Sequence, residues 1–111
     1  MVYDPSKVTA EQQLANPRSV AVSAADVELA PDRQNKNRRV MISITPITAG
    51  VTVTVTYGDG AAVMNAGQVL QPNQTMVASS DAGSSCWQGA IHAIASGAGS
   101  CAVLEQFEET F

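Results

Sequence analysis

Hydrophobic and polar residues alternate along much of the chain after position 18. The clearest stretch is residues 51–57, in which three valines and Tyr57 alternate with three threonines. A period of two is typical of a β-strand with one buried face and one solvent-exposed face. Residues 39–45 show the same alternation, and turn-forming residues at 46–50 separate the two stretches. We therefore expect these strands to form a β-hairpin or to be neighbours in a meander.

Further strands are predicted on both sides of this pair. Four weaker ones are bounded by Pro, Gly, Asn or Asp and cover residues 19–23, 26–30, 67–71 and 74–79. A stronger final pair, 89–95 and 100–107, is joined by residues 96–99, whose glycines are expected to supply the positive φ of a tight hairpin. Helical periodicity is weak throughout. The sequence predicts an all-β fold, a single small β-sandwich or jelly-roll-like domain of about seven or eight strands.

The start of the chain differs from the rest. Residues 1–18 are polar, contain two prolines and show no strand alternation, although Thr9 could cap a short helical turn. They are interpreted either as an extended N-terminal arm or as a disordered tail. The predicted organisation is an arm at 1–18 followed by one sandwich domain at 19–111, because a chain of 111 residues is the size of one domain.

Composition limits the classes of function that we expect of this chain. Charged residues make up 14% of the chain, against about 25% in an average soluble domain. So few charges are typical of a surface that other subunits cover. The net charge of −4 argues against nucleic-acid binding, which needs clustered Lys and Arg. The first residues resemble no signal peptide, and no apolar run is long enough for a membrane span, so we expect synthesis in a cytosol.

The two signs of charge are distributed unevenly. All six basic residues lie in the first 39 positions, and only acids follow. Chance in a weakly charged chain is one explanation. The alternative is that the basic segment of one subunit meets the acidic end of a neighbour and sets the register of an assembly. The candidate interface residues on this hypothesis are Arg33, Lys36, Arg38, Arg39, Glu105, Glu108 and Glu109.

Candidate chemistry is sparse. The one histidine, His92, alternates with apolar residues on a predicted strand and has no nucleophile motif beside it. Cys86 and Cys101 are expected to be thiols, because the predicted final hairpin would hold them too far apart for a disulfide. We expect no catalytic site, cofactor or metal. The one tryptophan, Trp87, is interpreted either as a core residue at one end of the sandwich or as an exposed contact for a partner.

Several motifs occur together in a fixed order. They are Arg38-Arg-Val-Met-Ile-Ser-Ile44, Tyr57-Gly58, Gly67-Gln-Val-Leu-Gln-Pro72, Trp87-Gln-Gly-Ala-Ile-His-Ala-Ile94 and Val103-Leu-Glu105. In this order the chain resembles a group of small virion proteins encoded by bacteriophages. The resemblance implies a capsid-associated structural protein, such as a decoration, vertex or fibre-base subunit, without enzymatic activity.

Two functions of different classes are therefore expected. The first is a structural subunit of a virion that packs against copies of itself and against other virion proteins, including a major capsid protein. The alternative is a carbohydrate- or receptor-binding module of a tail or fibre that uses Trp87, because sugar sites often stack an aromatic ring on the sugar. Neither hypothesis involves nucleic acid or a membrane.

Overall fold

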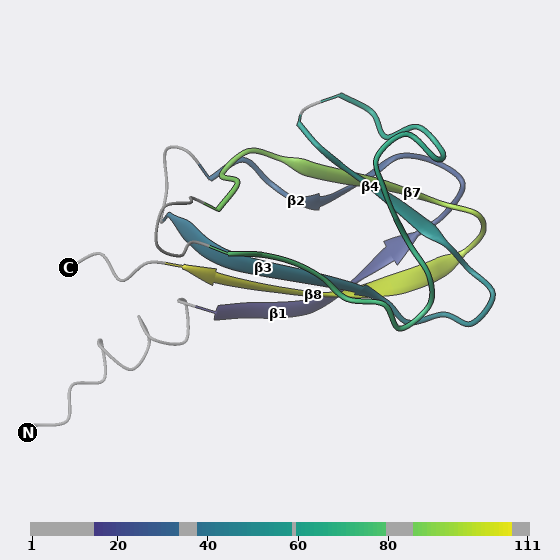
Figure 1. Cartoon of the computed structure of the whole chain (residues 1–111), viewed down its shortest axis with the longest axis horizontal. Helices are drawn as coiled ribbons and strands as arrows, with labels where there is room; N and C mark the ends of the chain where they lie inside the picture. Colours follow the sequence, from purple (N-terminus) through teal and green to yellow (C-terminus); the bar gives the residue numbers. More distant parts are fainter. Residues whose placement is uncertain (1–14, 34–37, 59, 80–85, 108–111) are drawn as a thin grey trace, which may run out of the picture.

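Two four-stranded antiparallel sheets face each other in the computed structural model, which describes residues 15–33, 38–58, 60–79 and 86–107 (Figure 1). The predicted all-β sandwich is confirmed, and each expected strand is present with ends shifted by a few residues. In chain order the strands are β1 (Ala15–Val22), β2 (Val27–Ala30), β3 (Arg39–Pro46), β4 (Val53–Tyr57), β5 (Gln68–Leu70), β6 (Met76–Ser79), β7 (Ile91–Ala95) and β8 (Gly99–Phe107).

The strand order shows that the eight strands form nested antiparallel pairs. One sheet has the order β1-β8-β3-β6 and the other has the order β2-β7-β4-β5. The first strand pairs with the last, the second with the seventh, the third with the sixth and the fourth with the fifth. This nested pairing, rolled so that β8 also meets β3 and β7 also meets β4, is the jelly-roll arrangement.

Both predicted hairpins are wrong. β3 and β4 belong to different sheets, and so do β7 and β8, because each connection crosses from one sheet to the other. Neither Gly97 nor Gly99 has a positive φ, as a tight hairpin turn would have required. The alternating pattern identifies which face of a strand is buried, but it does not identify the neighbouring strand. Among the described strands, the only consecutive pair within one sheet is β4 and β5.

The threonine-rich strand β4 is more deeply buried than its pattern predicts. Thr54, expected on a wet face, is only 1% exposed. The connection from β4 to β5 folds back over the outer side of this sheet (Figure 1). There the Asn65 amide donates to the Thr54 hydroxyl oxygen at 3.1 Å, and the Thr56 hydroxyl donates to the carbonyl oxygen of Ala66 at 3.2 Å. The threonines therefore hold this connection against the sheet.

The core lies between the sheets and is aliphatic, as the composition requires. Both sheets supply fully buried side chains, among them Leu29, Ile42, Ile44, Val53, Leu70, Ile91 and Val103.

At the start of β5 the backbone approaches β4 closely. Gly67 has a φ of +152°, and a Cβ at this position would lie 2.5 Å from the carbonyl oxygen of Val55. Only glycine fits there without displacing the strand.

The N-terminal boundary differs from the prediction. The first strand begins at Ala15 and not at 19, so residues 15–18 belong to the sandwich and not to an arm. The rest of the predicted arm, with its suggested helical turn at Thr9, lies outside the described residues. No helix within the described part of the chain has the length and apolar composition of a membrane span.

Candidate functional site

Three arginines meet one carboxylate inside the sandwich. Glu105, on β8, lies in phase with the core residues Cys101 and Val103, and its side chain is fully buried. One carboxylate oxygen is 2.7 Å from an Arg18 nitrogen and 3.0 Å from Arg33. The other accepts hydrogen bonds from Arg33 at 3.2 Å and from Arg39 at 2.8 Å. We call these four residues, Arg18, Arg33, Arg39 and Glu105, the arginine–glutamate cluster.

Arg39 connects this cluster to the segment that precedes β7. Its guanidinium, also fully buried, donates to the carbonyl oxygens of Trp87 at 2.7 Å, Gly89 at 3.2 Å and Pro31 at 2.9 Å. The Arg39 amide donates in addition to the side-chain oxygen of Gln88 at 2.7 Å. A buried arginine is tolerated only when its donors find acceptors. Arg39 therefore ties the segment that follows β2 and the segment that precedes β7 to this end of the sandwich.

Electrostatics keeps the Glu105 carboxylate ionised. Burial alone raises its pKa, but hydrogen bonds from Arg33 and Arg39 and the positive charge of Arg18 outweigh that effect. The net result is a pKa below the ordinary value of a glutamate. With three arginines around it, this carboxylate is a buried anion at neutral pH.

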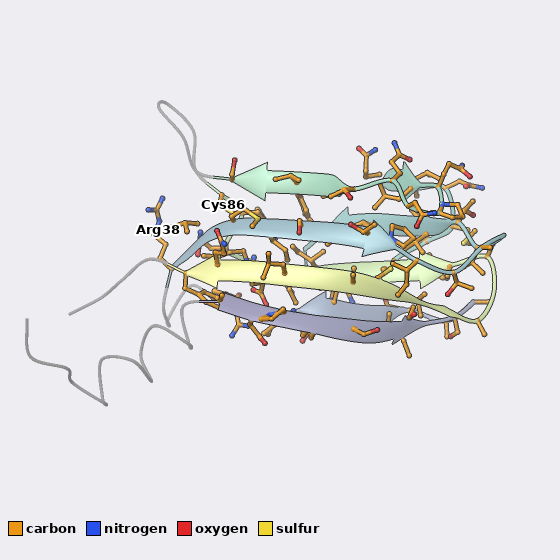
Figure 2. All side chains as sticks on the ribbon, turned by 90° about the horizontal axis from the view of Figure 1, so that it is seen from below. Arg38 and Cys86 are labelled. Carbon is orange, nitrogen blue, oxygen red and sulfur yellow. The ribbon has the colours of Figure 1, made fainter. Side chains whose placement is uncertain are left out.

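The predicted charged interface is corrected at two positions. Arg39 and Glu105 have no exposed surface and pair with each other within one chain, so they cannot contact a neighbouring subunit. Arg33 joins the same internal cluster and lies 4.9 Å from the centre of the Phe107 ring. Arg38, which immediately precedes β3, is exposed (Figure 2). Lys36, Glu108 and Glu109 lie outside the described residues.

Trp87 lies at the same end, partly exposed, so neither interpretation from the sequence describes it fully. Its indole stacks on the ring of Tyr57, with ring centres 5.6 Å apart and planes 10° from parallel. The side chains of Trp87 and Tyr57 are 39% and 42% exposed. The indole N–H donates to the carbonyl oxygen of Ala90 at 3.0 Å. A Cβ on Gly89 would lie 2.6 Å from the indole, so this glycine makes room for the ring.

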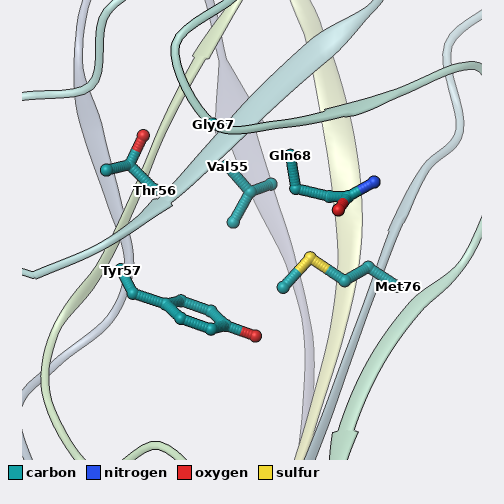
Figure 3. Close-up of a pocket in the computed structure, with 6 residues that line it drawn as sticks. All are labelled: Val55, Thr56, Tyr57, Gly67, Gln68 and Met76. Carbon is teal, nitrogen blue, oxygen red and sulfur yellow. The ribbon is translucent and has the colours of Figure 1, made fainter.

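A cleft of about 260 Å³ opens next to Tyr57, at the side of the sandwich where the edge strands β5 and β6 lie. Figure 3 shows its lining of aliphatic, thioether, aromatic and polar side chains: Val55, Thr56, Tyr57, Gly67, Gln68 and Met76. Burial raises the pKa of the Tyr57 hydroxyl, which stays protonated. The cleft and the stacked pair together form an aromatic and apolar surface that sequence reasoning missed, because Tyr57 and Trp87 are far apart in the chain.

His92 pairs with an acid on the outer side of the β2-β7-β4-β5 sheet. Its Nδ1 lies 3.0 Å from a carboxylate oxygen of Asp26, whose other oxygen accepts the Ala62 amide at 2.7 Å. The hydrogen bond from Ala62 lowers the pKa of Asp26 most, burial raises it in part, and the contact with His92 lowers it again, so that the net shift is downward. The described residues contain no group of three or more His, Cys, Asp or Glu side chains placed to hold a metal ion.

Both cysteines are thiols, as predicted, although the hairpin used to argue it does not exist. The Cys86 thiol (Figure 2) donates to the carbonyl oxygen of Ala78 at 3.6 Å. Burial raises the pKa of Cys86, and it raises the pKa of Cys101 to about 11. Since the thiolate is the reactive form, burial lowers the reactivity of both thiols at neutral pH, and both side chains pack as small apolar residues.

Comparison with protein-family models, with curated proteins and with solved structures found no match to this chain.

Replacing Glu105 by Gln is expected to destabilise the fold strongly. The amide keeps the shape of the side chain but leaves three arginines around a neutral group, and breaking a buried ion pair in this way costs about 3–5 kcal/mol. Urea unfolding followed by circular dichroism measures the loss. The matched control, Glu28→Gln, changes a side chain that is 51% exposed and should stay within about 0.5 kcal/mol of wild type. Equal stabilities of the two variants would contradict the role assigned to Glu105.

The stability that Glu105 contributes should depend on pH. Its pKa is lower in the folded chain than in the unfolded chain, where it is about 4.3. The contribution is therefore fully present above that value and is lost as pH falls through the lower folded pKa. We expect the difference in unfolding free energy between wild type and Glu105→Gln to be constant near neutral pH and to shrink below about pH 4. A difference that grows on acidification would be the opposite sign and would exclude this linkage.

Proposed function

We propose that this chain is a structural subunit of a bacteriophage particle, a decoration, vertex or fibre-base protein that functions by packing against a capsid protein and copies of itself. The observation that carries the proposal is the strand order, β1-β8-β3-β6 against β2-β7-β4-β5. Jelly rolls of this kind are the building units of many viral capsids. Fold alone does not assign function, so the argument also depends on what the motif residues do.

The motifs that carry the resemblance to phage virion proteins converge on one structural network. Arg39 comes from the first motif, Trp87 and Gly89 from the fourth, and Glu105 from the last. Arg39 bonds the backbone of Trp87 and Gly89 and the carboxylate of Glu105. A motif whose members hold the fold together, and present no reactive group, is what a packing subunit requires. This convergence supports a structural role more than a catalytic one.

The charge distribution supports the same role. Three of the six basic residues are used inside the arginine–glutamate cluster, which leaves an outer surface with still fewer charges than the composition suggests. Exposed apolar side chains occur on several connections and edges, among them Ile47, Val63, Met64 and Val77. Arg38, with Lys36, Glu108 and Glu109, remains a candidate polar contact to neighbouring subunits.

The proposal predicts that the chain is part of the particle. Phage carrying this gene should be purified by density gradient and washed in high salt, and its proteins should be quantified by mass spectrometry. We expect this chain at a fixed ratio to the major capsid protein, because a structural subunit occupies equivalent lattice sites. An abundant host protein serves as the control for carry-over. Recovery of the chain only in the soluble lysate would contradict the proposal.

A second candidate, a carbohydrate-binding module, is favoured by one observation, the exposed stacked pair of Tyr57 and Trp87 beside the cleft. Aromatic rings of this kind can stack on a sugar. Wild type and Trp87→Ala should be compared on a glycan array. If the second function holds, specific binding is present in wild type and is lost in the variant. The control, Ile47→Ala, removes a similarly exposed apolar side chain elsewhere and should bind as wild type does. Wild type that binds no glycan would exclude this candidate.

A further inference from the structure

The outer face of the β1-β8-β3-β6 sheet carries no charged side chain among the described residues. These four strands contain three charged residues, Arg18, Arg39 and Glu105, and all three turn inward to form the buried cluster. The pleat then directs only neutral side chains outward. Figure 2 looks directly onto this face.

Rows of side chains cross the face in the register of the strands. The central row is Pro17, Leu104, Ser43 and Val77, one residue from each strand. The neighbouring row toward the start of β8 contains Ser19, Ala102 and Thr45. The row on the other side contains Gln106, Met41 and Ser79. The large apolar side chains Leu104, Met41 and Val77 therefore lie among smaller ones, a relief that suits the packing of two sheets about 10 Å apart.

The outer face of the β2-β7-β4-β5 sheet differs because it carries charged side chains and is partly covered. It carries His92 with the acids Asp26 and Glu28, and the connection between β4 and β5 covers part of it. Ala62 of that connection is buried at 5% exposure. Within the described part of the chain, one sheet is covered and charged and the other is bare and neutral.

The size of the bare face fits a specific contact. Four strands spaced about 4.8 Å apart, the longer ones about 27 Å in length, cover roughly 500 Å². Two such faces packed together would bury about 1,000 Å², which is the lower limit for a specific protein interface.

Charge indicates which partner this face fits. The chain has a net charge of −4, so two copies repel each other wherever charged surfaces meet. A basic partner would be selected by acidic side chains, and the described residues of this face include none. The neutral face is the surface through which two equally charged copies can approach with least repulsion.

We propose that the outer face of the β1-β8-β3-β6 sheet is the contact between two copies of this chain, related by a two-fold axis through the sheet. The proposal rests on the proposed function, because it names one partner of the structural subunit. In such a contact the same rows face each other, and Leu104 and Met41 of one copy lie against the small side chains of the other.

The test is the mass of the purified chain in solution, measured by light scattering and sedimentation across the micromolar range. Wild type should be a dimer or a higher even oligomer. Ala102→Glu places an acid on the exposed face of β8, so that two like charges meet at the contact. We expect its self-association to be weaker by at least about 100-fold, the effect of a few kcal/mol of repulsion. The matched control, Ala98→Glu, adds the same charge to an exposed alanine in the β7–β8 connection and should leave the mass unchanged.

Circular dichroism must show the same β-signal for both variants, so that lost association is not lost folding. As a second measurement, Ser43→Cys should be joined between copies by a short bis-maleimide, whereas Ala98→Cys should not. Wild type that is monomeric, or an oligomer that Ala102→Glu leaves intact, overturns the proposal. A monomer that still co-purifies with phage particles would overturn this contact while leaving the structural role standing. Absence from the particles would count against the structural role alone.

Discussion

The carboxylate of Glu105 is the group around which one end of this jelly roll is organised. It accepts contacts from Arg18 on β1, from Arg39 on β3 and from Arg33 in the connection between β2 and β3. Arg39 extends the network to the backbone of the segment before β7. Removing a charge from water costs several kcal/mol, and here one anion and three cations offset that cost for one another. The carboxylate thus joins β1, β3 and β8 of one sheet, and through Arg39 the network also reaches the segment that leads into β7 of the other sheet.

The sequence was sufficient to predict which segments are strands. Alternation in residues such as those of β3 reports directly which side chains are buried, since each strand must bury one face. It was not sufficient to predict pairing. In a nested topology β1 meets β8 and β2 meets β7, and nothing local to either segment specifies a partner so distant. The turn residues that suggested hairpins also occur in connections that cross from one sheet to the other, so they do not distinguish the two arrangements.

The same reasoning explains what was missed at the candidate site. Glu105 lies in phase with Cys101 and Val103, and that phase was a signal that its side chain faces inward. Charge type alone suggested a surface contact, because buried acids are rare without partners. The partners are supplied by the fold. Likewise, the stacking of Trp87 on Tyr57 depends on the pairing of β4 with β7, which periodicity does not reveal.

The nested pairing also constrains the order in which the strands can pair. β4 and β5 are close in sequence and can pair as soon as both exist, whereas each surrounding pair closes a longer loop. β1 must wait for β8, its hydrogen-bonded neighbour, which follows the other seven described strands along the chain. Arg18 and Arg39 precede Glu105 in the chain, so they cannot form their ion pairs with this carboxylate until β8 has been synthesised. The β1-β8-β3-β6 sheet therefore stays incomplete until β8 has been synthesised, whereas β4 and β5, at the centre of the nest, can pair before that point.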